Sequence, residues 1–152
     1  MWLIVKQTLL TIAAALFILA SPALVHHATA KNAQVLNAVN HIRAAHGLRP
    51  LTLHPALQKA ADRQSLIMAK TGRMAHTAAR GYDFKSRLAR VGYRGLAAEN
   101  IARGQESLSR VLRGWLNSPG HRRNMLHPRM RYLGLSVARG GGKPYWTMVL
   151  GG

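Results

Sequence analysis

The sequence of 152 residues contains no cysteine, so disulfide bonds, a thiolate metal site and a cysteine nucleophile are all excluded. A domain without disulfides has to be stabilised by packing. Acidic residues are scarce as well, and a mechanism that needs a carboxylate must use Asp62, Asp83, Glu99 or Glu106. Aromatic residues make up 6% of the chain and are not interleaved with the basic ones, which argues against a stacking platform for single-stranded nucleic acid.

Positive charge, in contrast, is abundant. The chain has 22 lysines and arginines against four acids, a formal net charge of +18. The basic residues are spread from Lys31 to Lys143 and are not gathered in one tract. Such a charge attracts polyanions in general, so nucleic acid, lipid head groups and anionic wall polymers all satisfy the same electrostatics. A generally solvated cationic surface fits the pattern equally well.

The N-terminal thirty residues differ in composition from the rest. Lys6 is their only charge, and the segment Thr8–Ala20 is almost wholly apolar. This run of about 13 residues is shorter than the roughly 20 that span a membrane, and Ala28-Thr29-Ala30 is a small-x-small cleavage pattern. We therefore predict a signal peptide at residues 1–30 and one mature domain at 31–152. Cleavage after Ala23 and an uncleaved anchor are the alternatives.

Hydrophobic periodicity and helix caps predict the elements of the mature domain. Helices are expected at residues 32–46, 55–72 and 83–91, from the Ser107 cap through Trp115, and as a short turn at 121–126. Two strands, 132–138 and 144–150, flank Gly140-Gly141-Gly142 and form a hairpin signal. The segment 96–102 is too short and mixed to assign. Helices first and strands last favour an α+β domain over a parallel α/β one.

Glu99 is the acid that a structural role explains least well. Asp62 reads as a helix-surface charge, Asp83 as a helix cap, and Glu106 as a partner of the positive end of a helix. Glu99 instead lies in an apolar segment, where an ionised carboxylate costs several kcal/mol unless it is paired. Arginines or histidines must compensate it, and the position is open to either a structural ion pair or a functional site.

Two of the eight histidines have settings that raise them above the rest. His76 follows a predicted helix end that turns into a loop, and His121 lies in Ser118-Pro119-Gly120-His121. The others in the predicted mature domain fit surface, capping or loop positions: His41, His46, His54 and His127.

Motifs along nearly the whole mature chain resemble the CAP superfamily, also called SCP-like, in its bacterial form. This family is named for cysteine-rich secretory proteins, antigen five and plant pathogenesis-related proteins. The matching motifs, in the family's order, are Asn40-His41-Ile42-Arg43 with Gly47 and Leu51, Met68-Ala69-x-x-Gly72-x-x-x-His76, Ala98-Glu99-Asn100-Ile101-Ala102-x-Gly104, Trp115-x-x-Ser118-Pro119-Gly120-His121-Arg122-x-Asn124-Met125-Leu126, and Gly134-x-x-Val137 with Tyr145-Trp146-Thr147.

The resemblance implies a three-layer α-β-α sandwich with a central antiparallel sheet flanked by helices. It also implies that His76, Glu99 and His121 line one cleft, to which we assign Ser118 and Asn100 as well. In some members two histidines of this cleft bind a divalent metal such as zinc, which makes His76 and His121 the candidate ligands. The family's second glutamate is missing here, because the position three past Trp115 is Ser118. Full metal affinity is therefore in question.

Three functions stay open at this point. The first is an extracytoplasmic, monomeric binding module whose cleft, with or without zinc, holds an envelope or lipid-like ligand. The second is a hydrolase, metal-assisted or with Glu99 as general base toward a water or the Ser118 hydroxyl, and with His121 donating to the leaving group. No G-x-S-x-G or H-E-x-x-H motif supports it. The third is a cationic binder of anionic envelope polymers or DNA.

Overall fold

The computed structural model describes the backbone of residues 22–152 and the side chains of residues 32–152. Its elements in chain order are α1 (Pro22–Ala44), β1 (Thr52–Leu53), α2 (Pro55–Thr71), α3 (Phe84–Arg90), β2 (Ala97–Arg103), α4 (Leu108–Leu116), α5 (Pro119–Met125), β3 (Tyr132–Gly140) and β4 (Lys143–Gly151). α1 continues through the predicted cleavage position after Ala30. Residues 1–21 of the predicted signal peptide lie outside the described residues.

The strands form one sheet in the order β1-β3-β4-β2. β4 pairs antiparallel with both β3 and β2, so the three long strands have the antiparallel arrangement that the resemblance implies. The two-residue strand β1, which was not among the predicted elements, pairs parallel with β3 and makes the sheet mixed. β2 is an edge strand, and its Glu99 lies opposite Val149 of β4.

The predicted hairpin is confirmed as the pair β3–β4. Its turn is built by Gly141 and Gly142, whose φ angles of 55° and 74° lie in the left-handed region. Residues other than glycine rarely adopt these angles, and two such residues give the turn the twist that flanking strands require. The three-glycine run therefore fixes where the chain reverses.

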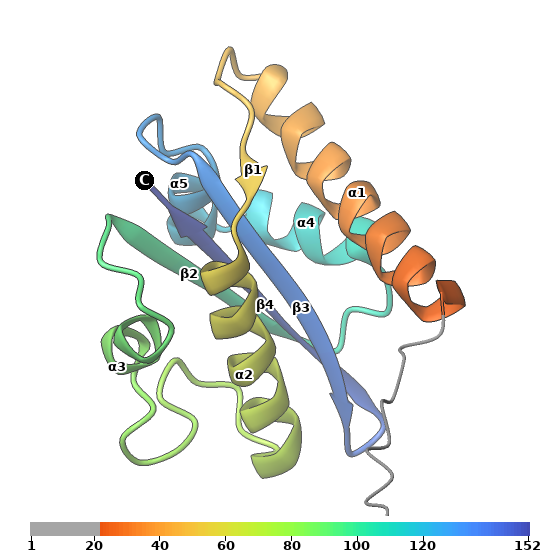
Figure 1. Cartoon of the computed structure of the whole chain (residues 1–152), viewed down its shortest axis with the longest axis vertical. Helices are drawn as coiled ribbons and strands as arrows, with labels where there is room; N and C mark the ends of the chain where they lie inside the picture. Colours follow the sequence, from red (N-terminus) through yellow and green to blue (C-terminus); the bar gives the residue numbers. More distant parts are fainter. Residues whose placement is uncertain (1–21) are drawn as a thin grey trace, which may run out of the picture.

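Helices cover both faces of the sheet and complete a three-layer sandwich. Figure 1 shows α2 in front of the sheet and α4 and α5 behind it. The larger core lies on the side of α1, α4 and α5 and includes Val39, Leu51, Leu112, Trp115, Met125, Leu133, Met148 and Leu150. The smaller core, on the side of α2 and α3, comprises Leu57, Ala60, Ala61, Leu88 and Val149. Successive residues of β4 thus face opposite layers, as strand geometry requires.

Close packing of α2 against β3 depends on Gly134. A Cβ atom added at this glycine would meet the backbone carbonyl carbon of Leu57 at 2.3 Å, which no real side chain tolerates. Leu57, Ala60 and Ala61 are fully buried on the facing side of α2. The small residues on this side of α2 therefore let the helix lie directly on the strand.

Several predicted boundaries move by a few residues. The segment 96–102, left unassigned, is the strand β2. α5 begins at Pro119, two residues earlier than expected, because a proline in the first turn loses no helical hydrogen bond. The helix expected at 32–46 begins earlier and ends at Ala44. The predicted caps are confirmed, since Asp83 accepts from the Ser86 N–H and Ser107 from the Arg110 N–H.

Arg43 joins the C-terminal end of α1 to the segment between α5 and β3. Its guanidinium is fully buried and donates to the backbone carbonyls of Arg49 at 3.0 Å, Met125 at 2.8 Å, His127 at 3.3 Å and Met130 at 3.4 Å. Burial lowers the pKa of this guanidinium, because the charged form loses its hydration. The backbone carbonyls replace that water and tie α1 to the end of α5 and the start of β3.

Replacing Arg43 with methionine keeps an apolar stem but leaves these carbonyls without a donor. We expect the free energy of unfolding to fall by about 3–5 kcal/mol, as when one partner of a buried charged network is removed. Urea denaturation measures it. Arg110→Met, at an exposed position of α4, is the control and should cost less than about 0.5 kcal/mol. Equal losses in the two variants would refute a stabilising role for the buried guanidinium.

Candidate functional site

The Glu99 carboxylate is buried between a histidine and an arginine. Its side chain is 2% exposed; Oε1 lies 2.8 Å from Nδ1 of His76, and Oε2 accepts from Nη2 of Arg87 at 2.5 Å. Arginine and histidine are the two residue types that the sequence indicated as compensation. Both residue types are present, because Glu99 forms an ion pair with Arg87 and also contacts His76.

Arg87 is a residue of this site that sequence reasoning did not single out. Its side chain is fully buried in α3, where it also donates to the backbone carbonyls of His76, at 2.7 Å, and of Tyr82. The signal available in the sequence was its place beside Leu88 and four residues before Val91, on the inward stripe of the predicted helix 83–91. One guanidinium thus holds both the Glu99 carboxylate and the chain that carries His76.

The loop between α2 and α3 presents His76 at the surface. Buried Gln64 of α2 donates to the carbonyl of Ala75 at 2.7 Å, and Arg87 takes the next carbonyl, that of His76. These two hydrogen bonds hold the carbonyl groups before and after the Cα atom of His76. The His76 side chain itself is 55% exposed, so one edge of the ring contacts Glu99 while the rest faces solvent.

Asn100 connects β2 to α5 and so positions His121. Its side chain is fully buried, its Nδ2 donates to the carbonyl of His121 at 3.0 Å, and its Oδ1 accepts from Nδ2 of Asn124 at 2.9 Å. Asn124 Nδ2 also reaches the carbonyl of Glu99 at 3.5 Å. Glu99 and Asn100 are neighbours in a strand and therefore point to opposite faces, one toward α3 and the other toward α5.

The His121 ring lies beside Ser118 and Trp115. Its Nδ1 is 3.0 Å from the Ser118 hydroxyl, which makes no capping bond to α5, and the ring centroids of His121 and Trp115 are 6.5 Å apart. Trp115 is held by its own hydrogen bond to the carbonyl of Ile101 at 3.1 Å. Burial lowers the pKa of His121, and repulsion from His76 lowers it further, so the imidazole is neutral at neutral pH.

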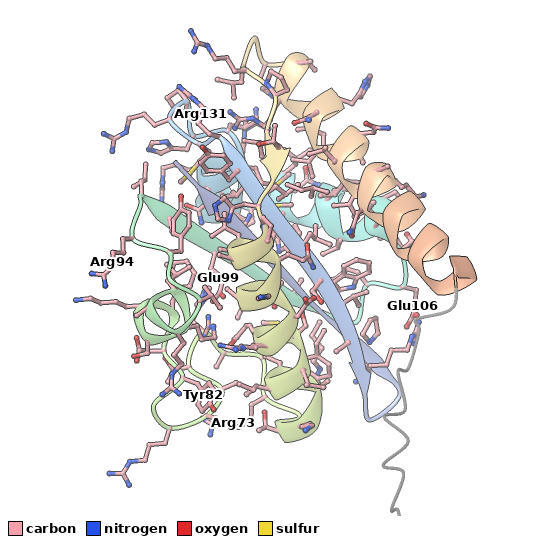
Figure 2. All side chains as sticks on the ribbon, viewed as in Figure 1. Arg73, Tyr82, Arg94, Glu99, Glu106 and Arg131 are labelled. Carbon is pink, nitrogen blue, oxygen red and sulfur yellow. The ribbon has the colours of Figure 1, made fainter. Side chains whose placement is uncertain are left out.

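A cleft of about 290 Å³ opens beside this second histidine. Its lining includes Met74, Gln105, Trp115, Ser118 and His121. His76 and Glu99 are not among the lining residues, and Asn100 supports the cleft from within. The structure therefore arranges the predicted site residues as two adjoining pairs, His76 with Glu99 and Ser118 with His121, on either side of β2. Figure 2 shows Glu99 in the middle of the domain, between α3 and α2.

Comparison with known proteins identifies the family. The profile of the cysteine-rich secretory protein (CAP) family matches residues 36–150. The chain belongs to the CAP family. The uncharacterised protein YkwD of Bacillus subtilis is 32% identical to this CAP domain over 117 residues, which are 75% of the chain and 44% of YkwD. A second B. subtilis relative, the uncharacterised membrane protein YlbC, is also 32% identical, over 73% of the chain and 32% of its own length. The chain thus spans less than half of the curated relatives it matches.

Solved structures share the fold of this CAP domain. An extracellular protein of Bacillus anthracis that contains an SCP domain aligns with a TM-score of 0.71 and 28% identity, over 81% of this chain and 40% of the other. An outer surface protein of Borrelia burgdorferi aligns with a TM-score of 0.70 and 21% identity, over 80% of this chain and 92% of the other. In the described residues of this chain, no helix combines the length and apolar character needed to cross a membrane.

The imidazoles do not form a complete zinc site in this CAP domain. Both oxygens of Glu99 are engaged, whereas the contacts of His76 with Glu99 and of His121 with Ser118 use only Nδ1, an arrangement that leaves Nε2 for a metal. Zinc sites in proteins use three or four protein ligands, and the described residues contain no group of three His, Cys, Asp or Glu that could hold a metal. Zinc binding at His76 and His121 stays a prediction.

The buried ion pair predicts that replacing Arg87 destabilises the fold much more than replacing the exposed Arg139. Arg87→Met leaves the Glu99 carboxylate buried without its cation, and we expect the free energy of unfolding to fall by about 3–5 kcal/mol. Adding Glu99→Gln should recover part of this loss, because the unpaired charge disappears. Arg139→Met is the matched control: its pair with Glu106 is 61% and 51% exposed and should contribute less than about 1 kcal/mol. Chemical denaturation compares the variants, and equal losses would contradict the assignment.

The lowered pKa of His121 predicts a pH dependence of known sign. The folded protein favours the neutral imidazole, so the unfolded chain binds more protons and the free energy of unfolding falls as the pH drops from 6.5 through the folded-state pKa. Proton NMR of the ring should give a midpoint below 6.5, and His76→Gln should raise it only partly, since burial is the larger cause. His121→Gln should weaken the pH dependence relative to His41→Gln, an exposed control on α1. A midpoint at or above 6.5 would contradict this.

Proposed function

We propose that this chain is an extracytoplasmic CAP domain that acts as a binding module, with its ligand in the cleft beside His121. The apolar N-terminal segment with its small-x-small pattern supports export, and two structural neighbours are described as extracellular or outer-surface proteins. We place the signal peptide at residues 1–30 and the binding domain at 31–152, and we expect it to act as a monomer.

The burial of Glu99 is the observation that favours binding over catalysis. A general base has to reach the proton that it removes, directly or through one water. The Glu99 side chain is 2% exposed and both of its oxygens are taken, one by Arg87 and the other by His76. Its carboxylate therefore holds β2, α3 and the His76 loop together and has no access to a substrate.

The cleft lining indicates the chemistry of the ligand. Trp115 and Met74 supply apolar surface, while Gln105, Ser118 and His121 supply hydrogen-bonding groups. Its volume of about 290 Å³ is near the lower end of the range for small-molecule pockets. These properties suit an amphipathic segment of an envelope component, such as a lipid head group with its first methylenes.

A hydrolase is the second candidate because Ser118 and His121 lie side by side. The neutral His121 imidazole, 3.0 Å from the Ser118 hydroxyl, is placed to act as its base. In this candidate the base is His121, and not Glu99 as in one of the two hydrolase mechanisms considered from the sequence. Among the described side-chain contacts, no carboxylate orients the His121 ring, so the pair lacks the third member of a triad.

Binding can be tested with dihexanoyl phosphatidylglycerol as a soluble amphipathic probe. We expect the methyl signal of Met74 and the ring signals of His121 to shift on titration, and Met74→Ala to weaken binding several-fold. Leu53→Ala is the control, because Leu53 is 37% and Met74 50% exposed but only Met74 lines the cleft. Repeating the titration with zinc, alone and with the probe, tests the metal prediction in His76→Ala and His121→Ala.

Activity assays on the wild type and its variants test the hydrolase candidate. On ester, peptide and nucleic-acid substrates we expect no turnover from the wild type, with or without zinc. Turnover that Ser118→Ala and His121→Ala abolish while Glu99→Gln retains it would replace the binding proposal with a serine–histidine hydrolase. Probe shifts that spread evenly over the surface and survive Met74→Ala would refute the cleft as the binding site.

A further inference from the structure

Each of the four acidic side chains of this chain has a partner within the domain. Asp62 accepts from Gln58 at 3.0 Å, Asp83 caps α3 through Ser86, Glu99 is held by Arg87, and Glu106 by Arg139. Within residues 32–152, Arg87 and Arg139 are therefore the arginines that pair with a carboxylate, and no lysine does so. Most of the positive charge has no internal counterion, so an external anion is its natural partner.

One groove is lined by two of these uncompensated arginines. It lies between α2 and α3, has a volume of about 490 Å³, and is lined by Arg63, Leu66, Ile67, Tyr82 and Arg90. Arg63, Leu66 and Ile67 share one face of α2 because they are three and four residues apart. No acid lines the groove, so two guanidiniums face an apolar floor and an aromatic ring.

The Arg90 guanidinium is already oriented for a ligand. Its carbon lies 4.8 Å from the centroid of the Tyr82 ring, and Nη2 donates to the carbonyl of Gly81 at 3.3 Å. An arginine fixed in this way loses less conformational entropy when it binds, and its planar fork matches a phosphate group. Figure 2 shows Tyr82 beside Arg73 at the end of the molecule where α2 and the following loop meet.

The exposed side of α2 extends the charge beyond the groove. Lys59, Arg63 and Lys70 are exposed and occur at intervals of four and seven residues, which places them in one row along the helix. At 1.5 Å per residue this row is about 16 Å long. A row of cations beside a groove is complementary to a linear polyanion, whereas a single small anion would use only one point of it.

We propose that the groove between α2 and α3 binds a linear phosphodiester polymer with small neutral repeats, of the poly(glycerol phosphate) type. Arg63 and Arg90 hold one phosphate between them, and Lys59 and Lys70 attract the phosphates before and after it. Leu66 and Ile67 contact the carbon atoms of the repeat. The groove lies on the α2–α3 face of the sheet, whereas His121 and its cleft lie beside α5, so the two sites are independent.

Two other polyanionic partners fit the groove less well. Nucleic acid binding to single strands gains from stacking of bases on aromatic faces, and one face of Tyr82 is covered by the Arg90 guanidinium. A membrane surface favours cations on a protruding face, whereas Arg63 and Arg90 line a hollow. Both are included as arms of the test.

The test compares two double variants with the same change in net charge. Arg63→Gln/Arg90→Gln removes the groove cations, and Arg110→Gln/Arg129→Gln removes exposed arginines that line none of the grooves described. Fluorescently labelled poly(glycerol phosphate) is titrated at two salt concentrations. We expect the groove variant to bind about tenfold more weakly and the control less than about twofold. The slope of log affinity against log salt should fall by about one for each lost contact.

Several outcomes of this experiment would overturn the proposal. Equal losses in the two double variants would show that net charge alone binds the polymer, and would overturn the proposal. A single-stranded oligonucleotide or phosphatidylglycerol vesicles that bind more tightly than the polymer, with the same dependence on Arg63 and Arg90, would overturn the choice of partner. Thermal melting verifies folding, and Arg63→Gln against Arg110→Gln replaces the double variants if the loss of Arg90 disturbs the Tyr82 loop.

Discussion

The ion pair between Glu99 and Arg87 joins the edge strand β2 to α3 and to the loop that carries His76. Glu99 comes from the edge strand β2 and Arg87 from α3, and the same guanidinium binds the backbone of the loop that presents His76. Because the pair is buried, each charge depends on the other for the hydration that it has lost. This contact helps to position His76 and to dock α3, and it makes the carboxylate inaccessible to solvent.

Most of the fold could be predicted because its elements carry local signals. Helix α2 has a stripe of small and apolar residues, α3 and α4 have side-chain caps, and the three-glycine run marks the hairpin. β2 lacked such a signal because Glu99 and Asn100 place polar side chains on both of its buried faces, which hides the alternation of a half-buried strand. β1 has only two residues, too few for any periodicity.

The candidate site could be predicted in part. The cost of burying a carboxylate indicated that Glu99 has a cationic partner, but the choice of Arg87 depends on how α3 packs, which local sequence does not encode. Ser118 and His121 are three residues apart at the start of a helix, so their proximity could be predicted from the sequence. The meeting of the His76 and His121 segments at β2 came from the family resemblance, because long-range contacts leave no trace in one sequence.

The side chains that position the site also protect the sheet from unwanted self-association. An unpaired strand edge is a template on which another chain can add a strand, and β2 is such an edge. Its carbonyls at Glu99 and Ile101 accept instead from Asn124 and Trp115, and the opposite edge is the two-residue β1. A chain with no disulfide to hold its sheet closed therefore keeps both borders short or occupied, which lowers its tendency to aggregate into fibrils.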